Sequence, residues 1–279
     1  MKEKIIAAFK IIRPINAIIA FVSVIVAAFI CSPEEIAWFS VLLASFAAAF
    51  TLSAGNIIND IYDLGIDKVN RPERPLPSGK ISKNSALILY FLLIAASLIL
   101  SWFINLYAFI IVIIATILLV LYSKFLKRVL FIGNILVALL TGLVFIFGGV
   151  AVRNPSAAII PALFAFLINF IREVVKDMQD VDGDKNAGVN TFPIRYGFQK
   201  SKILILLMTF TLILYTLYPF VARLYKIEYF IIVMIIVNPI LVFSLKILFK
   251  DRSIKNLNMI SNLLKLSMVF GLIAIYLGV

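Results

Sequence analysis

Long apolar runs, separated by short polar and charged segments, follow one another along the whole chain. Each run approaches the roughly 20 residues that a helix needs to cross the hydrocarbon core of a bilayer. The pattern therefore predicts an all-α, multi-pass protein with nine transmembrane helices. The expected spans are Pro14–Ile30, Ile36–Ile58, Ala86–Phe103, Leu106–Leu121, Val129–Val150, Ser156–Val175, Ile203–Val221, Tyr229–Leu248 and Ile260–Gly278.

Composition supports a membrane protein and removes several kinds of chemistry. The 279 residues are 63% hydrophobic and their mean hydropathy is +1.10, whereas soluble domains are about 45–50% apolar. The single cysteine, Cys31, excludes an intramolecular disulfide. Histidine is absent, which excludes a histidine general base and metal sites that depend on imidazole.

The net charge of +12 is divided unevenly between the two sets of loops that nine spans create. Arg153, Arg223 and Lys226 fall on one side, and Lys265 lies within the last span. The remaining basic residues gather on the other side, in residues 2–13, 68–83, 124–128, 172–202 and 246–255. Basic loops stay in the cytoplasm, so the pattern predicts a cell-membrane protein with a cytoplasmic N-terminus. It also explains the positive charge without a nucleic-acid partner.

Two acidic stretches share one spacing and follow the second and sixth spans, on the predicted cytoplasmic side. Both read D-x-x-D-x-x-x-D-K, first at Asp60, Asp63, Asp67 and Lys68, then at Asp177, Asp180, Asp184 and Lys185. On a helix these offsets lie within one stripe, so each stretch can direct three carboxylates at one target. The recurrence suggests that the single domain, residues 1–279, contains an internal four-helix repeat with its motifs at 59–67 and 177–184.

Clustered carboxylates repel one another unless a cation lies between them. Mg²⁺ prefers oxygen ligands and usually bridges carboxylates to the phosphates of a substrate, whereas metals that prefer thiolate or imidazole find no ligands here. The expected cofactor is therefore Mg²⁺. The candidate metal ligands are Asn59, Asp60, Asp63, Asp67, Asp177, Asp180 and Asp184.

Basic residues accompany the first acidic stretch. Lys68, Arg71 and Arg74 follow it closely, and arginine binds phosphate oxygens through two parallel hydrogen bonds. Carboxylates for a metal beside cations for phosphate predict a diphosphate site. The alternative is a solvated acidic loop balanced by lysines, which an isolated D-x-x-D would favour but a motif repeated on one membrane face does not.

These motifs resemble the UbiA superfamily of intramembrane prenyltransferases, over about residues 10 to 200. Asn59, Asp63 and Asp67 are similar to its first aspartate-rich motif, and Asp180 and Asp184 to its second. Further matching positions are Arg13-Pro14-x-Asn16, Arg71, Arg74, Pro75-Leu-Pro-Ser-Gly, Tyr122-Ser-x-x-Leu-Lys127 and Gly133-Asn134.

The resemblance implies nine transmembrane helices around a central cavity, with a polar cytoplasmic cap that carries both motifs. In this family Mg²⁺ binds the diphosphate of an isoprenyl donor, the allylic C–O bond ionises, and an acceptor captures the carbocation. The implied catalytic residues are Asn59, Asp63, Asp67, Asp180 and Asp184. The implied substrate-binding residues are Asn16, Lys68, Arg71, Arg74, Tyr122, Lys127, Arg172 and Lys176.

Acceptors differ within the family and include aromatic acids, quinone precursors and glycerol ether lipids. The run from Arg172 to Lys185 resembles the archaeal branch that transfers geranylgeranyl from geranylgeranyl diphosphate to geranylgeranylglyceryl phosphate, a membrane lipid precursor. Arg172 and Lys176 could bind the phosphate of that acceptor, or only neutralise Glu173 and Asp180. An aromatic or quinone prenyltransferase is the alternative, and a secondary transporter is a more distant one.

Overall fold

The computed structural model describes residues 2–32, 34–186, 188–251 and 253–279; Arg252, one of the basic loop residues, lies outside them. Within these residues the chain is helical and contains no strand, which confirms the all-α prediction. Nine of the described helical segments are long and apolar enough to cross a membrane, as predicted. They are Pro14–Cys31, Trp38–Tyr62, Lys83–Trp102, Leu106–Lys124, Ile132–Ala151, Ser156–Gln179, Phe192–Val221, Ile227–Lys250 and Ile254–Gly278.

Several helices extend beyond the apolar runs that predicted them. The second span continues to Tyr62 and the sixth to Gln179, and the seventh begins at Phe192 rather than at the predicted Ile203. Hydropathy marks only the part of a helix that lies in hydrocarbon, whereas the backbone hydrogen bonds of a helix also form between polar residues. These extensions carry the acidic side chains into helical structure.

The chain divides into two compact units. The first contains residues 1–127 and 144–156, and the second contains residues 128–143 and 157–279. α7 (Ile132–Ala151) contributes to both. Each unit contains one of the two acidic stretches. An internal four-helix repeat within a single domain stays a prediction.

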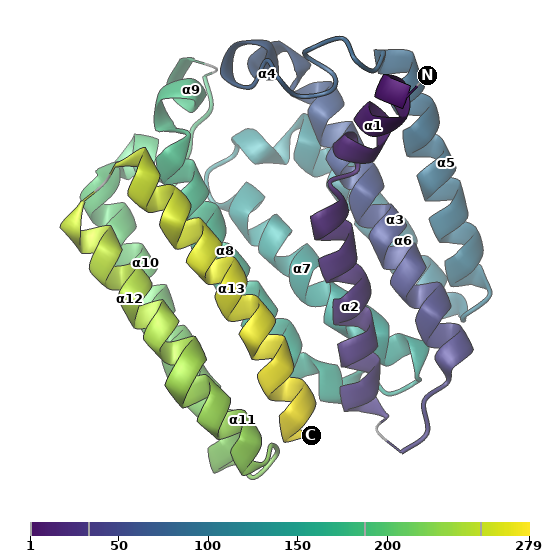
Figure 1. Cartoon of the computed structure of the whole chain (residues 1–279), viewed down its shortest axis with the longest axis vertical. Coiled ribbons are helices and arrows are strands. Elements are labelled where there is room, and N and C mark those ends of the chain that lie inside the picture. Colours follow the sequence, from purple (N-terminus) through teal and green to yellow (C-terminus); the bar gives the residue numbers. More distant parts are fainter. Residues whose placement is uncertain (1, 33, 187, 252) are drawn as a thin grey trace. The chain divides into compact units, whose positions relative to one another are not determined.

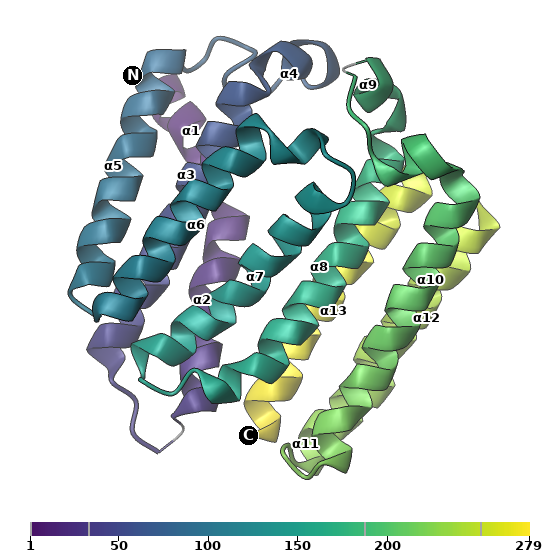
Figure 2. The same ribbon diagram turned by 180° about the vertical axis from the view of Figure 1, so that it is seen from behind.

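α3 (Trp38–Tyr62) is the centre of the first unit and packs against α2 (Pro14–Cys31), α5 (Lys83–Trp102) and α6 (Leu106–Lys124) (Figures 1 and 2). Its buried side is rich in small residues, which let helix backbones approach closely inside a membrane. A buried hydrogen bond of 2.6 Å joins the hydroxyls of Thr51 and Ser97 and links α3 to α5. Small side chains and internal polar contacts therefore hold this bundle together.

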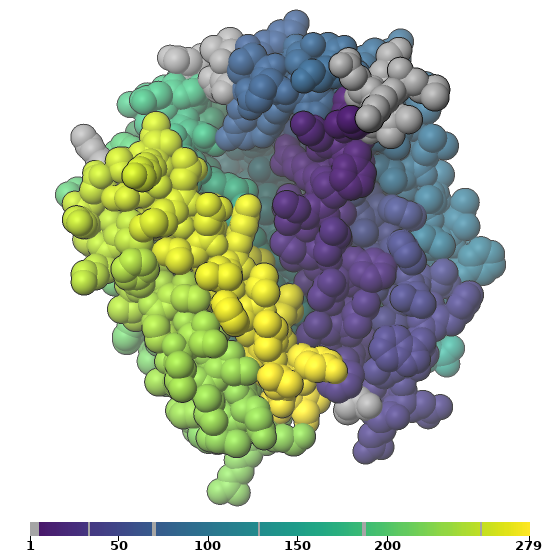
Figure 3. All heavy atoms as spheres, in the orientation of Figure 1, coloured from purple at the N-terminus to yellow at the C-terminus, as the bar shows by residue number. Residues whose placement is uncertain are grey.

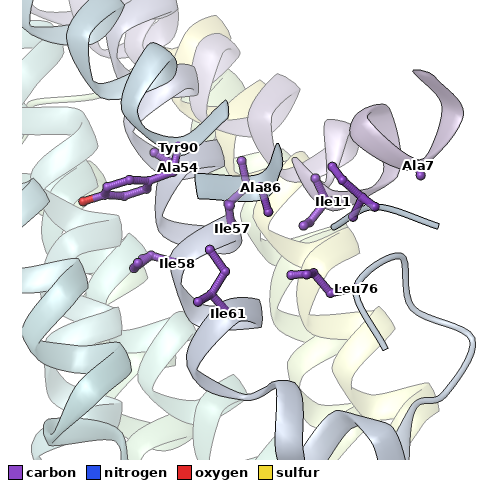
Figure 4. Packing of buried hydrophobic residues seen from close by; sticks show 10 residues of the cluster. Ala7, Ile11, Ala54, Ile57, Ile58, Ile61, Leu76, Ala86 and Tyr90 are labelled. Carbon is purple, nitrogen blue, oxygen red and sulfur yellow. The ribbon is translucent and has the colours of Figure 1, made fainter. Parts of the chain in front are cut away.

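A hydrophobic cluster fixes the polar end of α3 (Figure 4). Ile57 and Ile61, on the last turns of α3, lie among residues from α1 (Lys2–Ile11), α5 and the loop that follows α4 (Leu64–Asn70). The labelled members are Ala7, Ile11, Ala54, Ile57, Ile58, Ile61, Leu76, Ala86 and Tyr90. Because this cluster holds one side of the helix end, the polar residues between its members are fixed on the other side.

In the second unit, α8 (Ile159–Gln179) packs against α10 (Phe192–Val221) and α13 (Ile254–Gly278). α12 (Asn238–Lys250) also packs against α13, and atoms of both helices, yellow-green and yellow in Figure 3, cover one face of this unit. α12 continues α11 (Ile227–Ile232) through a π-helical turn, Val233–Val237, labelled η3. The three segments together form the eighth span.

Candidate active site

The first acidic stretch lies at a helix-to-helix turn. α3 ends at Tyr62, α4 begins at Leu64, and Asp63 is the single residue between them. The N–H of Asp63 donates to the carbonyl of Asn59 at 2.9 Å, and the N–H of Asp67 donates to the carbonyl of Asp63 at 2.8 Å. The helical hydrogen-bond pattern therefore continues through the turn and keeps these three side chains at helical spacing.

The second acidic stretch repeats this backbone. Asp180 is the single residue between α8 and α9 (Val181–Asn186). Its N–H donates to the carbonyl of Lys176 at 3.0 Å, and the N–H of Asp184 donates to the carbonyl of Asp180 at 2.8 Å. The shared sequence spacing thus corresponds to a shared local structure, in which one aspartate occupies the turn and another lies one helical turn later.

Arg74 joins two carboxylates of the first stretch. Its Nη1 lies 2.6 Å from Asp67 Oδ2 and 3.4 Å from Asp60 Oδ1. Arg13 reaches the same oxygen of Asp60 through Nη2 at 2.5 Å. The two arginines come from separate loops, one between α1 and α2 and the other after α4. Asp60 and Asp67 are therefore fixed by guanidinium groups from both sides of the sequence motif.

Asp63 has different partners. Lys127 Nζ forms an ion pair with Asp63 Oδ2, and the side-chain amide of Asn59 donates to the same oxygen at 2.9 Å. Lys127 lies in a short 3₁₀ turn after α6, Leu126–Arg128. In the first unit, an amide, a lysine and two arginines thus surround the carboxylates of the sequence motif.

All three aspartates of this cluster are buried, with only 3% of Asp60, 7% of Asp63 and 5% of Asp67 exposed. An ionised carboxylate is costly to bury unless it is paired and hydrogen-bonded, and here each one has a cation. The Oδ1 atom of Asn59, by contrast, is buried and has no hydrogen-bond partner among the described residues. An unpaired buried oxygen costs about 1–3 kcal/mol, and a ligand bound to this atom would recover that free energy.

The donor set of the first cluster fits Mg²⁺, because carboxylate and amide oxygens are the ligands that this ion prefers. Among the described residues no group of three or more acidic or cysteine side chains forms a ready metal cluster. The carboxylates of the first cluster instead form ion pairs, Asp67 with Arg74 and Asp63 with Lys127.

The other residues predicted for substrate binding near the first motif belong to the same unit. Lys68 is exposed on α4, and none of the described ion pairs includes it. Tyr122 on α6 and Arg71 after α4 are half-buried. Asn16 lies in the first turn of α2, where its N–H donates to the Arg13 carbonyl at 2.9 Å. In the described part of the chain, Lys68 and Asn16 take no part in the ion pairs around the three aspartates.

Arg13 is a site residue that was not assigned a role from the sequence. It is the N-cap of α2, in the left-handed region with φ 53° and ψ 70°. Pro14 disfavours the right-handed helical conformation at the preceding residue, so α1 and α2 separate at Arg13 and its guanidinium reaches Asp60. In the sequence, Arg13 could have been found through the Arg13-Pro14-x-Asn16 segment, which resembles a UbiA family motif.

The second acidic stretch is less buried than the first. Asp177 accepts a hydrogen bond of 2.9 Å from the side-chain amide of Asn134 on α7, and it interacts electrostatically with Glu173, Asp180 and Asp184. Asp180 is exposed, and Asp184 is half-buried. Four carboxylates of α8 and α9 therefore share one region of the second unit, with an amide donor fixing the orientation of Asp177.

Basic side chains lie within this acidic region, since Arg172 directly precedes Glu173 and Lys176 directly precedes Asp177. Glu173 Oε1 lies 3.4 Å from Arg172 Nη1 and 2.5 Å from Lys176 Nζ. Lys265 on α13 interacts electrostatically with both cations, although sequence reasoning gave it no role. Its only sequence signal was its position as a lysine inside an apolar span.

Fold and site define a class: a multi-pass, helical membrane protein in which arginine and lysine side chains hold buried carboxylates at the polar ends of its helices. The chain belongs to the UbiA prenyltransferase family, whose family profile matches residues 20–268. The resemblance seen in the sequence motifs is thereby confirmed, and the protein is a prenyltransferase.

Two similar relatives are both named digeranylgeranylglyceryl phosphate synthase. That of Methanocaldococcus jannaschii is 38% identical over 276 residues, which cover 99% of this chain and 97% of the relative. That of Methanosphaera stadtmanae is 36% identical over 269 residues, which cover 96% of this chain and 97% of the relative. The similarity therefore extends over both units and both acidic stretches.

Solved structures show the same fold. A structure described as giving insights into digeranylgeranylglyceryl phosphate synthase in membranes is 37% identical, covers 99% of this chain and 98% of its own, and has a TM-score of 0.80. A UbiA homologue from Archaeoglobus fulgidus, bound to DMAPP and Mg²⁺, has a TM-score of 0.65 at 19% identity, with 96% and 98% coverage. The second comparison supports the fold alone.

Proposed function

We propose that the protein transfers a geranylgeranyl group from geranylgeranyl diphosphate to geranylgeranylglyceryl phosphate and uses Mg²⁺. The cluster of Asp60, Asp63 and Asp67 with its arginine and lysine partners carries the proposal, because it supplies both metal ligands and phosphate-binding cations. The names of the relatives, which are 36% and 38% identical over nearly the whole chain, support the choice of acceptor.

Asn59, Asp63 and Asp67 would hold Mg²⁺ in the first unit, and Asp180 and Asp184 would do so in the second. Asp60 and Asp177 are further candidate ligands. When bound, the ion neutralises charge on the diphosphate as it departs. The unpaired Oδ1 of Asn59 is an oxygen donor that needs no ion pair to be broken before it binds.

The cations of the first unit would change partners when the donor binds. Arg74, Arg13 and Lys127 now neutralise the aspartates, and the same groups bind phosphate oxygens strongly. With a metal on the carboxylates, these side chains would be able to turn to the diphosphate and stabilise the charge that develops on it. Asn16, Lys68, Arg71 and Tyr122, from the same unit, are proposed to complete donor binding.

The reaction breaks the bond between C1 of the prenyl group and the diphosphate oxygen, and the diphosphate leaves with the electron pair. The acceptor hydroxyl oxygen then forms a bond to C1 and loses its proton. We assign that proton to the departing diphosphate, because Glu173 already contacts Arg172 and Lys176 and opposite charges nearby make a carboxylate a weaker base.

Purified protein, incubated with labelled geranylgeranyl diphosphate, Mg²⁺ and each acceptor separately, tests this function. We expect label in digeranylgeranylglyceryl phosphate, and we expect chelation of Mg²⁺ to abolish it. Labelling of an aromatic acid or quinone precursor alone would overturn the acceptor that we propose, while leaving the family assignment intact.

A further inference from the structure

α8 and α13 bring three cations together in the second unit. Arg172 and Lys176 are one helical turn apart on α8 and therefore lie on the same side of it. Lys265 lies on α13, which packs against α8 in both ribbon views (Figures 1 and 2). It is close enough for electrostatic interaction with both Arg172 and Lys176. We call these three residues the α8–α13 basic cluster.

Glu173 pairs with two side chains of the α8–α13 basic cluster, and two donor groups of the cluster stay without an acceptor in the described part of the chain. Glu173 contacts both Arg172 and Lys176 through the same oxygen, Oε1. Among the ion pairs and hydrogen bonds of the described residues, none includes Lys265. The Nε atom of Arg172 is also buried without an acceptor in the described part of the chain. Lys265 and the Nε of Arg172 are therefore the two donors of the cluster that can accept a bound anion as partner.

Lys265 lies inside the last apolar span. A lysine near the end of a span can extend its ammonium group to the membrane surface. Lys265 is half-buried between Leu264 and Leu266, about 8 Å along the helix axis from Ile260, where the apolar run begins. Ionisable residues at such positions generally mark binding sites or charge pathways. An anion bound there would satisfy both Lys265 and Arg172 Nε.

The charge of the cluster selects among anions. A phosphate monoester carries about −1.5 to −2 charges at neutral pH and offers three acceptor oxygens. Such a group can accept hydrogen bonds from both Lys265 and Arg172 Nε, whereas a phosphodiester of an ordinary lipid headgroup carries a single negative charge. The proposed acceptor is a lipid with a phosphate monoester, and its prenyl chain requires the apolar surroundings that α8 and α13 provide.

We propose that the α8–α13 basic cluster binds the phosphate of the acceptor and that Lys265 makes the enzyme prefer a phosphorylated acceptor to the neutral lipid alcohol. This inference rests on the proposed function and adds to it a residue, a site between two named helices and a basis for specificity. Lys265 is a specificity-determining residue that acts on the acceptor phosphate from α13, a helix that carries none of the proposed metal ligands.

Lys265→Met tests the inference, with Lys265→Arg as the charge-preserving variant and Lys255→Met as the matched control. Lys255 is an exposed lysine in the first turn of the same helix. Steady-state rates are measured with geranylgeranylglyceryl phosphate and with geranylgeranylglycerol, which lacks the phosphate. Thermal unfolding of each purified variant in detergent confirms that it is folded.

We expect Lys265→Met to raise the KM for the phosphorylated acceptor about tenfold or more, because a lost hydrogen bond to a charged group has that effect. The KM for geranylgeranyl diphosphate should stay unchanged, and the preference for the phosphorylated over the neutral acceptor should fall. Lys265→Arg should retain most of the preference, and Lys255→Met should behave as the parent protein does. Arg172→Ala should show the same selective effect on the acceptor.

Equal losses with both acceptors, or equal increases in both KM values, would assign Lys265 a structural role and overturn the inference. Competitive inhibition by added phosphatidylglycerol, present in the parent and absent in Lys265→Met, would also overturn it, because the site would then hold a bulk lipid headgroup. If the parent protein prenylates neither acceptor, the proposed function fails instead. Direct titration of parent and Lys265→Met with geranylgeranylglyceryl phosphate then still tests the site, which fails if the two bind equally.

Discussion

At the scale of residues, ion pairs between carboxylates and basic side chains build the first acidic cluster. Each of its buried aspartates contacts an arginine or a lysine, and Asn59 presents an oxygen with no partner among the described residues. The mechanism that we propose exchanges these partners, because a metal on the carboxylates would release the cations for phosphate. Asp63 is the residue that tests this arrangement best, since it lies at the turn itself and contacts both Lys127 and Asn59.

Asp63→Asn should reduce turnover about 100-fold or more, as expected when a group that stabilises the transition state is removed. It should also raise the Mg²⁺ concentration that gives half-maximal activity, because an amide oxygen is a weaker metal ligand than a carboxylate. Rates measured across a Mg²⁺ titration check both effects. Asp182→Asn is the control, because Asp182 is an exposed acidic residue on α9. Near-normal turnover and an unchanged Mg²⁺ requirement in Asp63→Asn would refute the metal role.

At the scale of helices, close backbone approach determines how the bundle of the first unit packs. Gly148 on α7 faces α2, and a Cβ atom there would lie 2.7 Å from both the Ala27 Cβ and the backbone oxygen of Val24. Backbone atoms cannot move aside as the end of a flexible side chain can. Because Arg13 is the N-cap of α2, the packing of α2 also affects the position of a cation at the first acidic cluster.

Gly148→Ala should lower the free energy of unfolding by about 1–3 kcal/mol, the usual cost of overpacking a well-packed interior. Thermal unfolding in detergent measures this as a lower midpoint. Gly271→Ala is the matched control, since a Cβ at Gly271 on α13 would meet no atom within 4 Å. That control should be neutral or slightly stabilising, because alanine favours helix more than glycine does. Equal midpoints for both variants would contradict close packing at Gly148.

At the scale of the whole molecule, the distribution of basic residues leads us to propose that the N-terminus and both acidic stretches face the cytoplasm. Charged loops remain on the cytoplasmic side because moving them across a bilayer is unfavourable. The donor and acceptor would then reach the enzyme from the cytoplasmic leaflet of the cell membrane. This orientation is independent of how either acidic cluster acts in catalysis.

Cysteine labelling in sealed membrane vesicles tests the orientation. Lys80 and Glu34 are exposed residues in loops that the prediction places on opposite sides. Lys80→Cys should react with a membrane-impermeant maleimide only in inside-out vesicles, and Glu34→Cys only in right-side-out vesicles. The parent chain controls for background, because its one cysteine, Cys31, is buried. The opposite labelling pattern would reverse the proposed topology.

The sequence by itself determined the helical class, the number of spans, the family and the positions of both acidic motifs. These properties depend on local hydropathy and on residue spacing along one helix, and both can be read without knowing which helices touch. The ends of α3, α8 and α10 were less predictable, because polar residues continue a helix where hydropathy no longer marks it.

Only the tertiary structure decided which charged side chains lie next to one another. Arg13 and Asp60 are 47 positions apart, and Lys127 and Asp63 are 64 positions apart, so no local pattern pairs them. Lys265 likewise meets Arg172 and Lys176 only because α13 packs against α8. Electrostatic interactions depend on distance in space, and in this protein the packing of distant helices sets that distance.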